Sequence, residues 1–146
     1  MAKQTPEGKV KKKLLDFLKS LGGDCFFYMP VQNGMGQTGI PDVMAIIKGV
    51  PFAFECKATP KQHPTALQAY ALDRIHKAAG FAWVVDDESI DIAIFYVKEL
   101  SEAAVQNGLY PGLEELEALK THKYAKAFYR WKDKLKPLEF NDGTRS

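Results

Sequence analysis

Three residues in the stretch GIPDVMAIIKGVPFAFECKA, at positions 39–58, have the types and spacing for metal-ion chemistry: two carboxylates that could bind the ion and a lysine beside them. Asp42 follows a proline at the start of one apolar run, and Glu55 and Lys57 lie two apart at the end of the next run. Because side chains alternate across a sheet, we expect Glu55 and Lys57 on one face and their aromatic neighbours on the core face. Hairpin pairing of the two runs would bring Asp42 close to Glu55.

Two carboxylates held together repel each other unless a cation lies between them. A hard cation such as Mg²⁺, bound by Asp42, Glu55 and the backbone carbonyl oxygen of Cys56, would relieve this repulsion. The alternative is a surface ion pair between Glu55 and Lys57, with Asp42 as an ordinary turn residue. An acid after a proline with E-x-K downstream often arises by chance, so spacing alone leaves both interpretations open.

Two further polar residues are candidates for the same site. Glu7 precedes Val10 and Leu14 at helical spacing, so we expect it on the apolar face of a first helix. A carboxylate there is costly unless it is paired or binds a metal, although the helix dipole also favours an acid in a first turn. Gln68 borders the expected apolar stripe of a second helix, where it could cap backbone groups or orient a water or a phosphate. That stripe consists of Leu67, Ala71, Leu72 and Ile75.

The elements that must position these residues follow the order α-β-β-β-α-β-β. This order predicts an α/β fold with a mixed central sheet flanked by helices. A threonine N-cap and Pro6 at the first helical position begin the first helix, and Gly22 ends it. The expected strands are 25–30, 42–47, 51–57, 81–85 and 90–97, and the expected second helix is 65–80.

The C-terminal part of the chain has a different pattern. Residues 111–137 start and end at proline and are expected to form one long helix. Its apolar stripe, which would pack on the core or on a partner subunit, consists of Tyr124, Phe128, Trp131 and Leu135. Its basic face, which could contact phosphates or simply be solvated, consists of Lys123, Lys126, Arg130 and Lys134.

Composition sets only broad limits. The 146 residues are 46% hydrophobic and 26% charged, which is typical of a soluble globular protein, and the net charge of +2 does not imply a polyanionic partner. Lysine and arginine concentrate in 1–13 and 120–136, which permits a nucleic-acid-facing side but also fits solvated helices. The two cysteines have no zinc or disulfide spacing. Without an apolar run of roughly 20 residues or a signal-peptide core, we expect a cytoplasmic protein with no membrane partner.

Taken together, Pro41-Asp42, Glu55-Cys56-Lys57 and the preceding Glu7 make the chain similar to the PD-(D/E)XK nuclease superfamily. Within it, the chain resembles the virus-type replication–repair nuclease (VRR-NUC) domain that occurs alone in bacteriophages. The similarity covers about residues 5–97 and not the tail from residue 99 onward. Cys56 departs from the apolar β-branched residue that is more frequent in the family, but the position contributes mainly its carbonyl group. The similar segments also include the loop with Gln32 and Asn33, the expected helix that bears Gln68, and the stretch AAGFAWVV.

The resemblance implies a restriction-endonuclease-like core over residues 1–98 and a helical C-terminal extension over 99–146. It also implies Mg²⁺- or Mn²⁺-dependent hydrolysis of phosphodiester bonds in DNA, selective for branched or junction structures, in phage or bacterial replication, repair or recombination. Asp42 and Glu55 would hold the metal, and Glu7 would bind it directly or through water. Lys57 would position the nucleophile and stabilise developing charge, with Gln68 in support.

The partners implied by the resemblance are DNA and a second copy of the chain, with the Trp131 stripe as a candidate dimer contact. The expected location is the cytoplasm of a bacterial host, with a phage gene as one source. The candidate DNA-contacting residues are Lys11, Lys12, Asn33, Lys61, Lys123, Lys126 and Arg130.

Two other functions compete with hydrolysis. The chain could grip DNA on a nuclease-like fold without cutting it, although a non-catalytic relative has no use for paired carboxylates. It could instead be an interaction protein built on the 111–137 helix, with the acids incidental.

Overall fold

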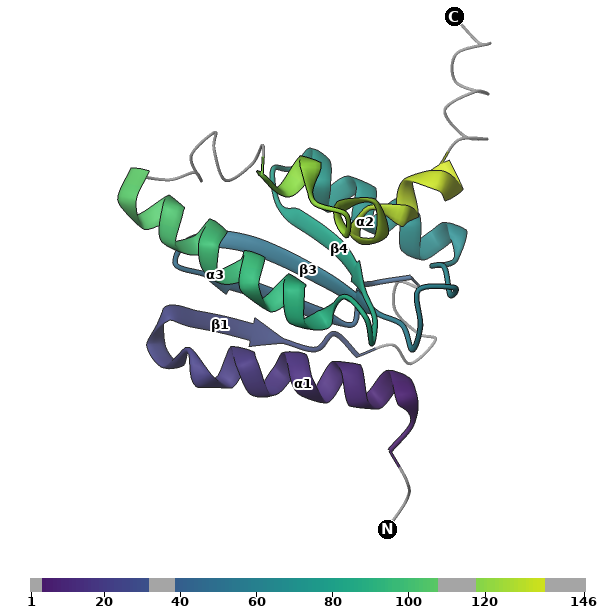
Figure 1. Cartoon of the computed structure of the whole chain (residues 1–146), viewed down its shortest axis with the longest axis horizontal. Helices are drawn as coiled ribbons and strands as arrows, with labels where there is room; N and C mark the ends of the chain where they lie inside the picture. Colours follow the sequence, from purple (N-terminus) through teal and green to yellow (C-terminus); the bar gives the residue numbers. More distant parts are fainter. Residues whose placement is uncertain (1–3, 32–38, 108–117, 136–146) are drawn as a thin grey trace, which may run out of the picture.

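A computed structural model describes residues 4–31, 39–107 and 118–135, which form a sheet flanked by helices (Figure 1). The sheet has four strands in the order β1-β2-β3-β4; β1, β2 and β3 are antiparallel, and β3 and β4 are parallel. The predicted α/β fold with a mixed sheet is therefore confirmed. The elements are α1 (Pro6–Ser20), η1 (Gly22–Asp24), β1 (Cys25–Tyr28), β2 (Val43–Ile47), β3 (Val50–Cys56), α2 (Ala66–Lys77), β4 (Phe81–Val85), α3 (Ile90–Asn107), α5 (Ala125–Phe128) and η2 (Arg130–Leu135).

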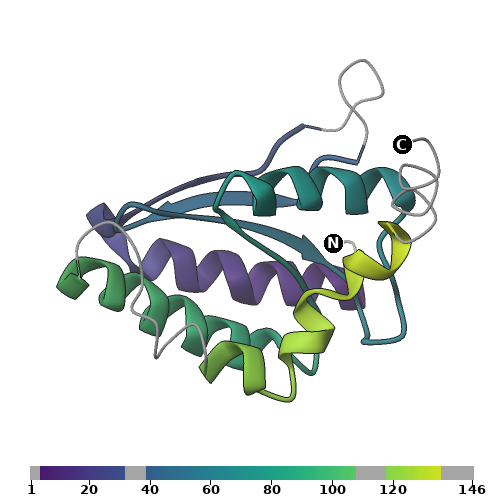
Figure 2. The same cartoon turned by 90° about the horizontal axis from the view of Figure 1, so that it is seen from above.

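Helices cover both faces of the sheet (Figure 2). Helices α1 and α3 pack on one face, against Phe52 and Phe54 of β3, as the alternation of the sequence predicts. Helix α2 packs on the other face, where Leu72 contacts a smaller cluster that includes Ala53. The face of β3 that carries Glu55 is therefore covered by α2, and Glu55 is buried.

Helix α1 begins as its sequence predicts. The backbone amide of Gly8 donates a hydrogen bond of 2.9 Å to the Thr5 hydroxyl, which satisfies one of the unpaired amides of a helix N-terminus. Val10 and Leu14 are buried at helical spacing, and both belong to the larger core cluster. This packing fixes the first turn of α1, which carries Glu7, over the end of the sheet.

A tight turn between β2 and β3 sets the register of the candidate site. Lys48 and Gly49 have φ values of 51° and 85°, the pair of left-handed residues that a two-residue hairpin turn needs. The resulting register pairs Val43 with Phe54. The next residues outward, Asp42 and Glu55, therefore lie opposite each other where the two strands end.

The strand predicted over 90–97 is wrong, because these residues form the first half of α3. The Asp86 carboxylate accepts hydrogen bonds of 2.9 Å from the backbone amides of Glu88 and Ser89, and so satisfies the amides of the turn that leads into α3. Strand-like alternation in IDIAIFYV covers only a short window. The buried positions continue at helical spacing past residue 97: Ile90, Ala93, Val97, Leu100 and Ala104.

The single helix predicted over 111–137 is also wrong for the residues that the structure describes. Residues 118–121, α5 and η2 are separate helical pieces, joined by turns. Phe128 packs with the cluster on the α1 and α3 face, whereas Trp131 packs with the cluster on the α2 face. The chain therefore wraps around the edge of β4 from one face to the other, as Figure 2 shows, and one straight helix could not follow that path.

This wrapping protects an edge strand. The Trp131 Nε1 group donates a hydrogen bond of 2.8 Å to the carbonyl oxygen of Ala82 in β4, and its ring is fully buried. Trp131 therefore packs within its own chain and is not an exposed dimer contact, which corrects that expectation. The predicted boundary between residues 98 and 99 also falls inside α3.

Candidate functional site

The register of the hairpin places the two candidate carboxylates side by side. Asp42 Oδ2 accepts a hydrogen bond of 2.8 Å from the backbone amide of Cys56, the residue that follows Glu55. Asp42 Oδ1 lies 3.7 Å from the ammonium nitrogen of Lys11 in α1. Hairpin pairing thus brings Asp42 to the end of β3, as the sequence predicts, and the hydrogen bond from Cys56 holds its carboxylate there.

Glu55 is the most unusual acid among the residues that the structure describes. Its side chain is only 2% exposed, and within the described part of the chain its Oε1 atom is the one buried side-chain polar atom without a hydrogen-bond partner. Its Oε2 atom lies 3.5 Å from the Lys57 ammonium. Burial, and secondly the charge of Asp42, raise the pKa of Glu55 from 4.5 to about 8 despite the opposing charge of Lys57. A buried carboxylate with one unused oxygen beside a second carboxylate is a costly arrangement.

Lys57 and Gln68 form the adjoining part of the site. The Lys57 ammonium donates to Gln68 Oε1 at 3.3 Å, and the Lys57 amide donates to the carbonyl oxygen of Val85. Gln68 also completes a capping box at the start of α2. Its backbone amide donates to the Thr65 hydroxyl, and its side-chain Oε1 accepts from the backbone amide of Thr65. Gln68 therefore caps backbone groups, one of its two expected roles, and contacts the candidate catalytic lysine as well.

The apolar stripe expected next to Gln68 is partly wrong. Leu67 is 57% exposed, and the fully buried residues of α2 are Ala69 and Leu72. The helix is thus rotated relative to the expectation. The rotation turns Leu67 outward and leaves Gln68 half-buried beside Lys57.

Glu7 lies near the pair but not within it. Its charge raises the pKa of Glu55 by a contribution smaller than that of Asp42, so the two groups are within electrostatic range. Within residues 4–31, 39–107 and 118–135, however, no three His, Cys, Asp or Glu side chains lie close enough to hold a metal ion. The predicted convergence of three acids is therefore not formed, and two acids form the site.

The residues present nevertheless fit a divalent cation. The test is the orphaned Oε1 of Glu55: a buried carboxylate oxygen without a donor next to the Asp42 carboxylate calls for a positive partner. Hard cations such as Mg²⁺ take carboxylate and carbonyl oxygens as ligands. Asp42 and Glu55 are the side chains that could hold one, with the Cys56 carbonyl as the predicted third ligand.

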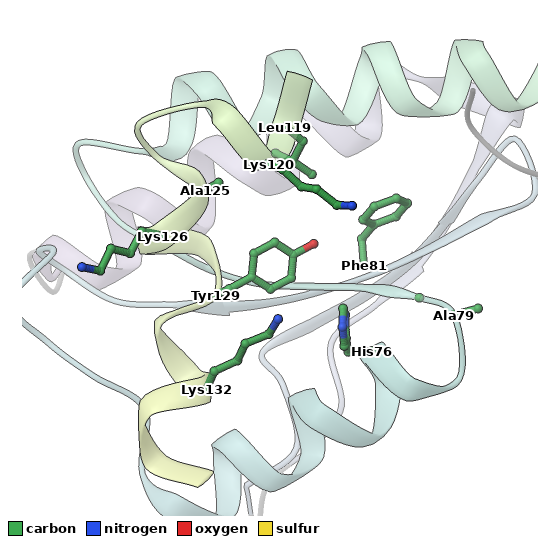
Figure 3. Close-up of a pocket in the computed structure, with 10 residues that line it drawn as sticks. His76, Ala79, Phe81, Leu119, Lys120, Ala125, Lys126, Tyr129 and Lys132 are labelled. Carbon is green, nitrogen blue, oxygen red and sulfur yellow. The ribbon is translucent and has the colours of Figure 1, made fainter. Parts of the chain in front are cut away.

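A separate pocket at the other end of β4 has different chemistry (Figure 3). It has a volume of about 620 Å³, and its walls include the rings of His76, Phe81 and Tyr129. Lys120 and Lys132 point into it, and no acidic residue is among its described lining. Phe81 begins β4, whereas Glu55 is paired with Val84 near the end of that strand. The described lining of this pocket therefore contributes no carboxylate to the candidate site formed by Asp42 and Glu55.

The candidate DNA-contacting residues have different environments. Lys61 and Lys126 are exposed, Lys123 is exposed with its ammonium over the Tyr124 ring, and Lys12 is paired with Asp16 at 2.6 Å. Lys11 is partly exposed, and its ammonium group lies 3.7 Å from Asp42 at the acidic site. Asn33, like Gln32 of the same loop, lies outside the described residues.

Arg130 does not belong to a basic surface, which corrects the sequence prediction. It is only 6% exposed, and its guanidinium donates to Asp86 Oδ2 at 2.9 Å. It also donates to the carbonyl oxygens of Thr59 and Gln62 in the loop that follows Lys57. Sequence analysis missed Asp86 and this role of Arg130, because no local pattern pairs residues 44 apart.

The segment of chain that leads to Asp42 packs closely against α2 at Gly39, and this gives a first prediction. A Cβ atom on Gly39 would lie 2.6 Å from the Leu67 backbone, and Gly39 has a φ of 81°. Gly39→Ala should therefore lower the free energy of unfolding by more than the roughly 1–2 kcal/mol that left-handed backbone costs a non-glycine residue. Urea unfolding would measure it.

The matched control is Gly49→Ala. Gly49 has a φ of 85° with nothing within 4 Å of a built Cβ, so it isolates the backbone cost. Equal losses for the two variants would contradict the close contact with Leu67.

The chain matches no protein-family model, no curated protein and no solved structure. None of the helices within the described residues is long and apolar enough to cross a membrane.

Proposed function

We propose that this protein is a Mg²⁺- or Mn²⁺-dependent nuclease of the PD-(D/E)XK superfamily, similar to stand-alone VRR-NUC domains, that hydrolyses phosphodiester bonds in DNA. The observation that carries the proposal is the pairing of buried Glu55 with the partly buried Asp42, with one Glu55 oxygen unpartnered and the Lys57 ammonium alongside. A cation in this position would compensate two carboxylates that otherwise cost the fold stability.

Each residue of the site has a chemical task in this proposal. Asp42 and Glu55 would hold the cation at the open end of the β2–β3 hairpin, where the backbone amide of Cys56 fixes the orientation of Asp42. A bound divalent ion supplies a water of lowered pKa and polarises a phosphoryl oxygen. Lys57, already beside Glu55, donates to the attacking water or to the phosphoryl oxygen that gains charge. Gln68 positions the Lys57 ammonium, and Glu7 acts through water because it lies outside the pair.

No element in the described residues has the pattern of a base-reading helix, so the protein contacts the DNA backbone and reads its shape, with branched or junction DNA as the preferred substrate. Exposed Lys61, Lys123 and Lys126 are candidate phosphate contacts. We further propose that the protein acts as a homodimer in the cytoplasm of a bacterial host, and that its gene belongs to a phage or to the host.

One observation favours a second candidate, a DNA-binding module without catalysis. The ammonium groups of Lys11 and Lys57 lie 3.7 Å and 3.5 Å from the Asp42 and Glu55 carboxylates, so lysines already provide positive charge at the site. In a pure binding module these lysines would replace the metal ion permanently. The unpartnered Glu55 oxygen argues against this, because the lysines leave it unsatisfied.

A cleavage assay distinguishes the two candidates and gives a second prediction. Purified protein is incubated with supercoiled, branched or single-stranded DNA and Mg²⁺ or Mn²⁺, beside Asp42→Ala and Lys57→Ala. Wild type should cut, and each variant should fold and bind but cut at least roughly 100-fold more slowly, since each loses transition-state stabilisation. Lys19→Ala, on an exposed part of α1, is the control that should cut normally.

The outcomes separate the candidates. Binding without cutting by wild type would favour the binding module, and neither binding nor cutting would favour an interaction protein. Wild-type cutting by either the Asp42 or the Lys57 variant would contradict the residue assignment.

A further inference from the structure

One half of the sheet face on which α2 lies carries exposed aromatic and apolar side chains. Phe26 and Tyr28 of β1 are 66% and 52% exposed, and Ile46 of β2 is 52% exposed. Helix α2 covers β3 and β4 on this face but leaves β1 and β2 open, and it turns Leu67 and Tyr70 toward solvent. Large exposed apolar patches on soluble proteins mark sites of interaction.

A groove of about 610 Å³ runs between this open half of the sheet and α2. Tyr28 and Met44 form its floor, and Tyr70 and Arg74 of α2 form part of its wall. The Arg74 guanidinium lies 5.9 Å from the centre of the Tyr70 ring. The described lining includes no acidic residue, so an anionic chain can enter without repulsion from the walls.

The groove adjoins the carboxylate site through Pro41, the residue before Asp42. Tyr28 pairs with Met44 across β1 and β2, and Met44 pairs with Ala53 across β2 and β3. Asp42 lies two residues before Met44 and therefore on the same face, roughly 7 Å along the strand. Pro41 lines the groove directly before Asp42. A DNA strand whose phosphate lies at Asp42 and Glu55 would thus have its neighbouring nucleotides at Tyr28 and Tyr70.

We propose that this groove binds unpaired bases of the DNA strand being cut, stacked on Tyr28 and Tyr70. This inference rests on the proposed nuclease function and specifies its substrate as DNA with single-stranded nucleotides next to the scissile phosphate. A base pair within a duplex hides its apolar faces in the helical stack, so an aromatic groove beside the site gains little from duplex DNA. Unpaired bases stack on aromatic side chains whatever their sequence, and arginine adds a cation near the phosphates.

Binding in EDTA tests this inference without requiring catalysis. Fluorescence anisotropy would measure the affinity for a labelled oligo(dT) strand and for a blunt duplex of the same length. The double variant Tyr28→Ala/Tyr70→Ala should bind the single strand at least tenfold more weakly, with duplex affinity changed less than twofold. Tyr28→Phe/Tyr70→Phe should keep wild-type affinity, because stacking requires the ring and not the hydroxyl.

The matched control is Phe95→Ala, which removes an aromatic ring of similar exposure (49%) from α3 on the other side of the sheet. It should leave both affinities unchanged. Equal single-strand affinity of wild type and the double alanine variant would overturn the inference. So would sedimentation that shows wild type as a dimer and the double alanine variant as a monomer with unchanged DNA affinity, because a second copy would then cover this face.

The two proposals fail in different ways. If wild type cuts DNA in Mn²⁺ while the tyrosine variants bind single strands normally, the nuclease function stands and the groove inference is overturned. If the double alanine variant loses single-strand binding but wild type cuts no DNA in Mg²⁺ or Mn²⁺, the stacking surface is supported and the nuclease function is overturned.

Discussion

Glu55→Gln should abolish cleavage and, in the absence of metal, make the protein more stable. In the proposed mechanism, loss of the carboxylate removes a ligand of the cation, so cleavage should fall at least about 100-fold, since a bound metal ion stabilises the transition state by several kcal/mol. The stability gain follows from burial: the substitution removes a nearly inaccessible carboxyl group whose ionisation is disfavoured by burial and by the charge of Asp42, which raise its pKa to about 8. Functional sites often reduce the stability of the fold in this way.

The pH dependence of this gain has a definite sign. The pKa of Glu55 is about 8 in the folded protein and 4.5 in the unfolded chain, so the folded state binds more protons between these values. Wild type should therefore lose stability as pH rises from 4.5 to 8, at up to about 1.4 kcal/mol per pH unit from this group. Below pH 4.5 the contribution vanishes, and above pH 8 the full loss remains.

Urea unfolding in EDTA at several pH values would measure the effect. The difference in unfolding free energy between Glu55→Gln and wild type should grow with pH and level off above pH 8. Glu102→Gln, which neutralises an acid whose side chain is 63% exposed, is the matched control and should show no such trend. A Glu55→Gln variant that is less stable than wild type at pH 8.5 would contradict the cost assigned to this buried charge.

Arg130→Met should lower the free energy of unfolding by about 3–5 kcal/mol, the usual loss when one partner of a buried ion pair is removed. Asp86 is fully buried, and the Arg130 guanidinium is its charged partner at 2.9 Å. Methionine keeps much of the side-chain volume, so the loss reports the charge and its hydrogen bonds more than a cavity. Lys134→Met, an exposed change in the same element η2, should alter stability by less than about 0.5 kcal/mol.

Arg130 should also affect the loop that follows Lys57. Its guanidinium holds the carbonyl oxygens of Thr59 and Gln62, and the Gln62 side chain accepts from the amides of Ala58 and Thr59. Hydrogen exchange of the Ala58 and Thr59 amides should therefore accelerate in Arg130→Met and not in Lys134→Met. Unchanged exchange together with unchanged stability would show that Arg130 does not link the C-terminal segment to this loop.

Local patterns in the sequence were sufficient for the site's scaffold. Alternation in FAFECK placed Phe54 in the core and Glu55 with Lys57 on the other face, and the hairpin brought Asp42 to Glu55. The capping pattern at Thr5 also predicted the start of α1 correctly. These features depend on neighbouring residues and on strand geometry, which a single sequence contains.

Features that depend on long-range packing were not predictable in the same way. The stretch 90–97 alternates like a strand, yet Asp86 caps a helix there whose buried face continues to Ala104. Arg130 reads as one cation of an exposed face, but its charge is neutralised by Asp86, far away in the sequence. Trp131 follows a helical stripe, but the chain turns around the β4 edge before it. Each case required knowledge of which surface the segment would meet.

Anomalous diffraction from a crystal soaked in Mn²⁺ tests the central claim most directly, because it locates the ion and its ligands together. We expect one anomalous peak within coordination distance of the Asp42 and Glu55 carboxylates, next to the Cys56 carbonyl oxygen and close to the Lys57 ammonium. A Glu55→Gln crystal soaked in the same way should lack that peak. A fully soaked wild-type crystal with no manganese between Asp42 and Glu55 would show that these two carboxylates do not form a metal site.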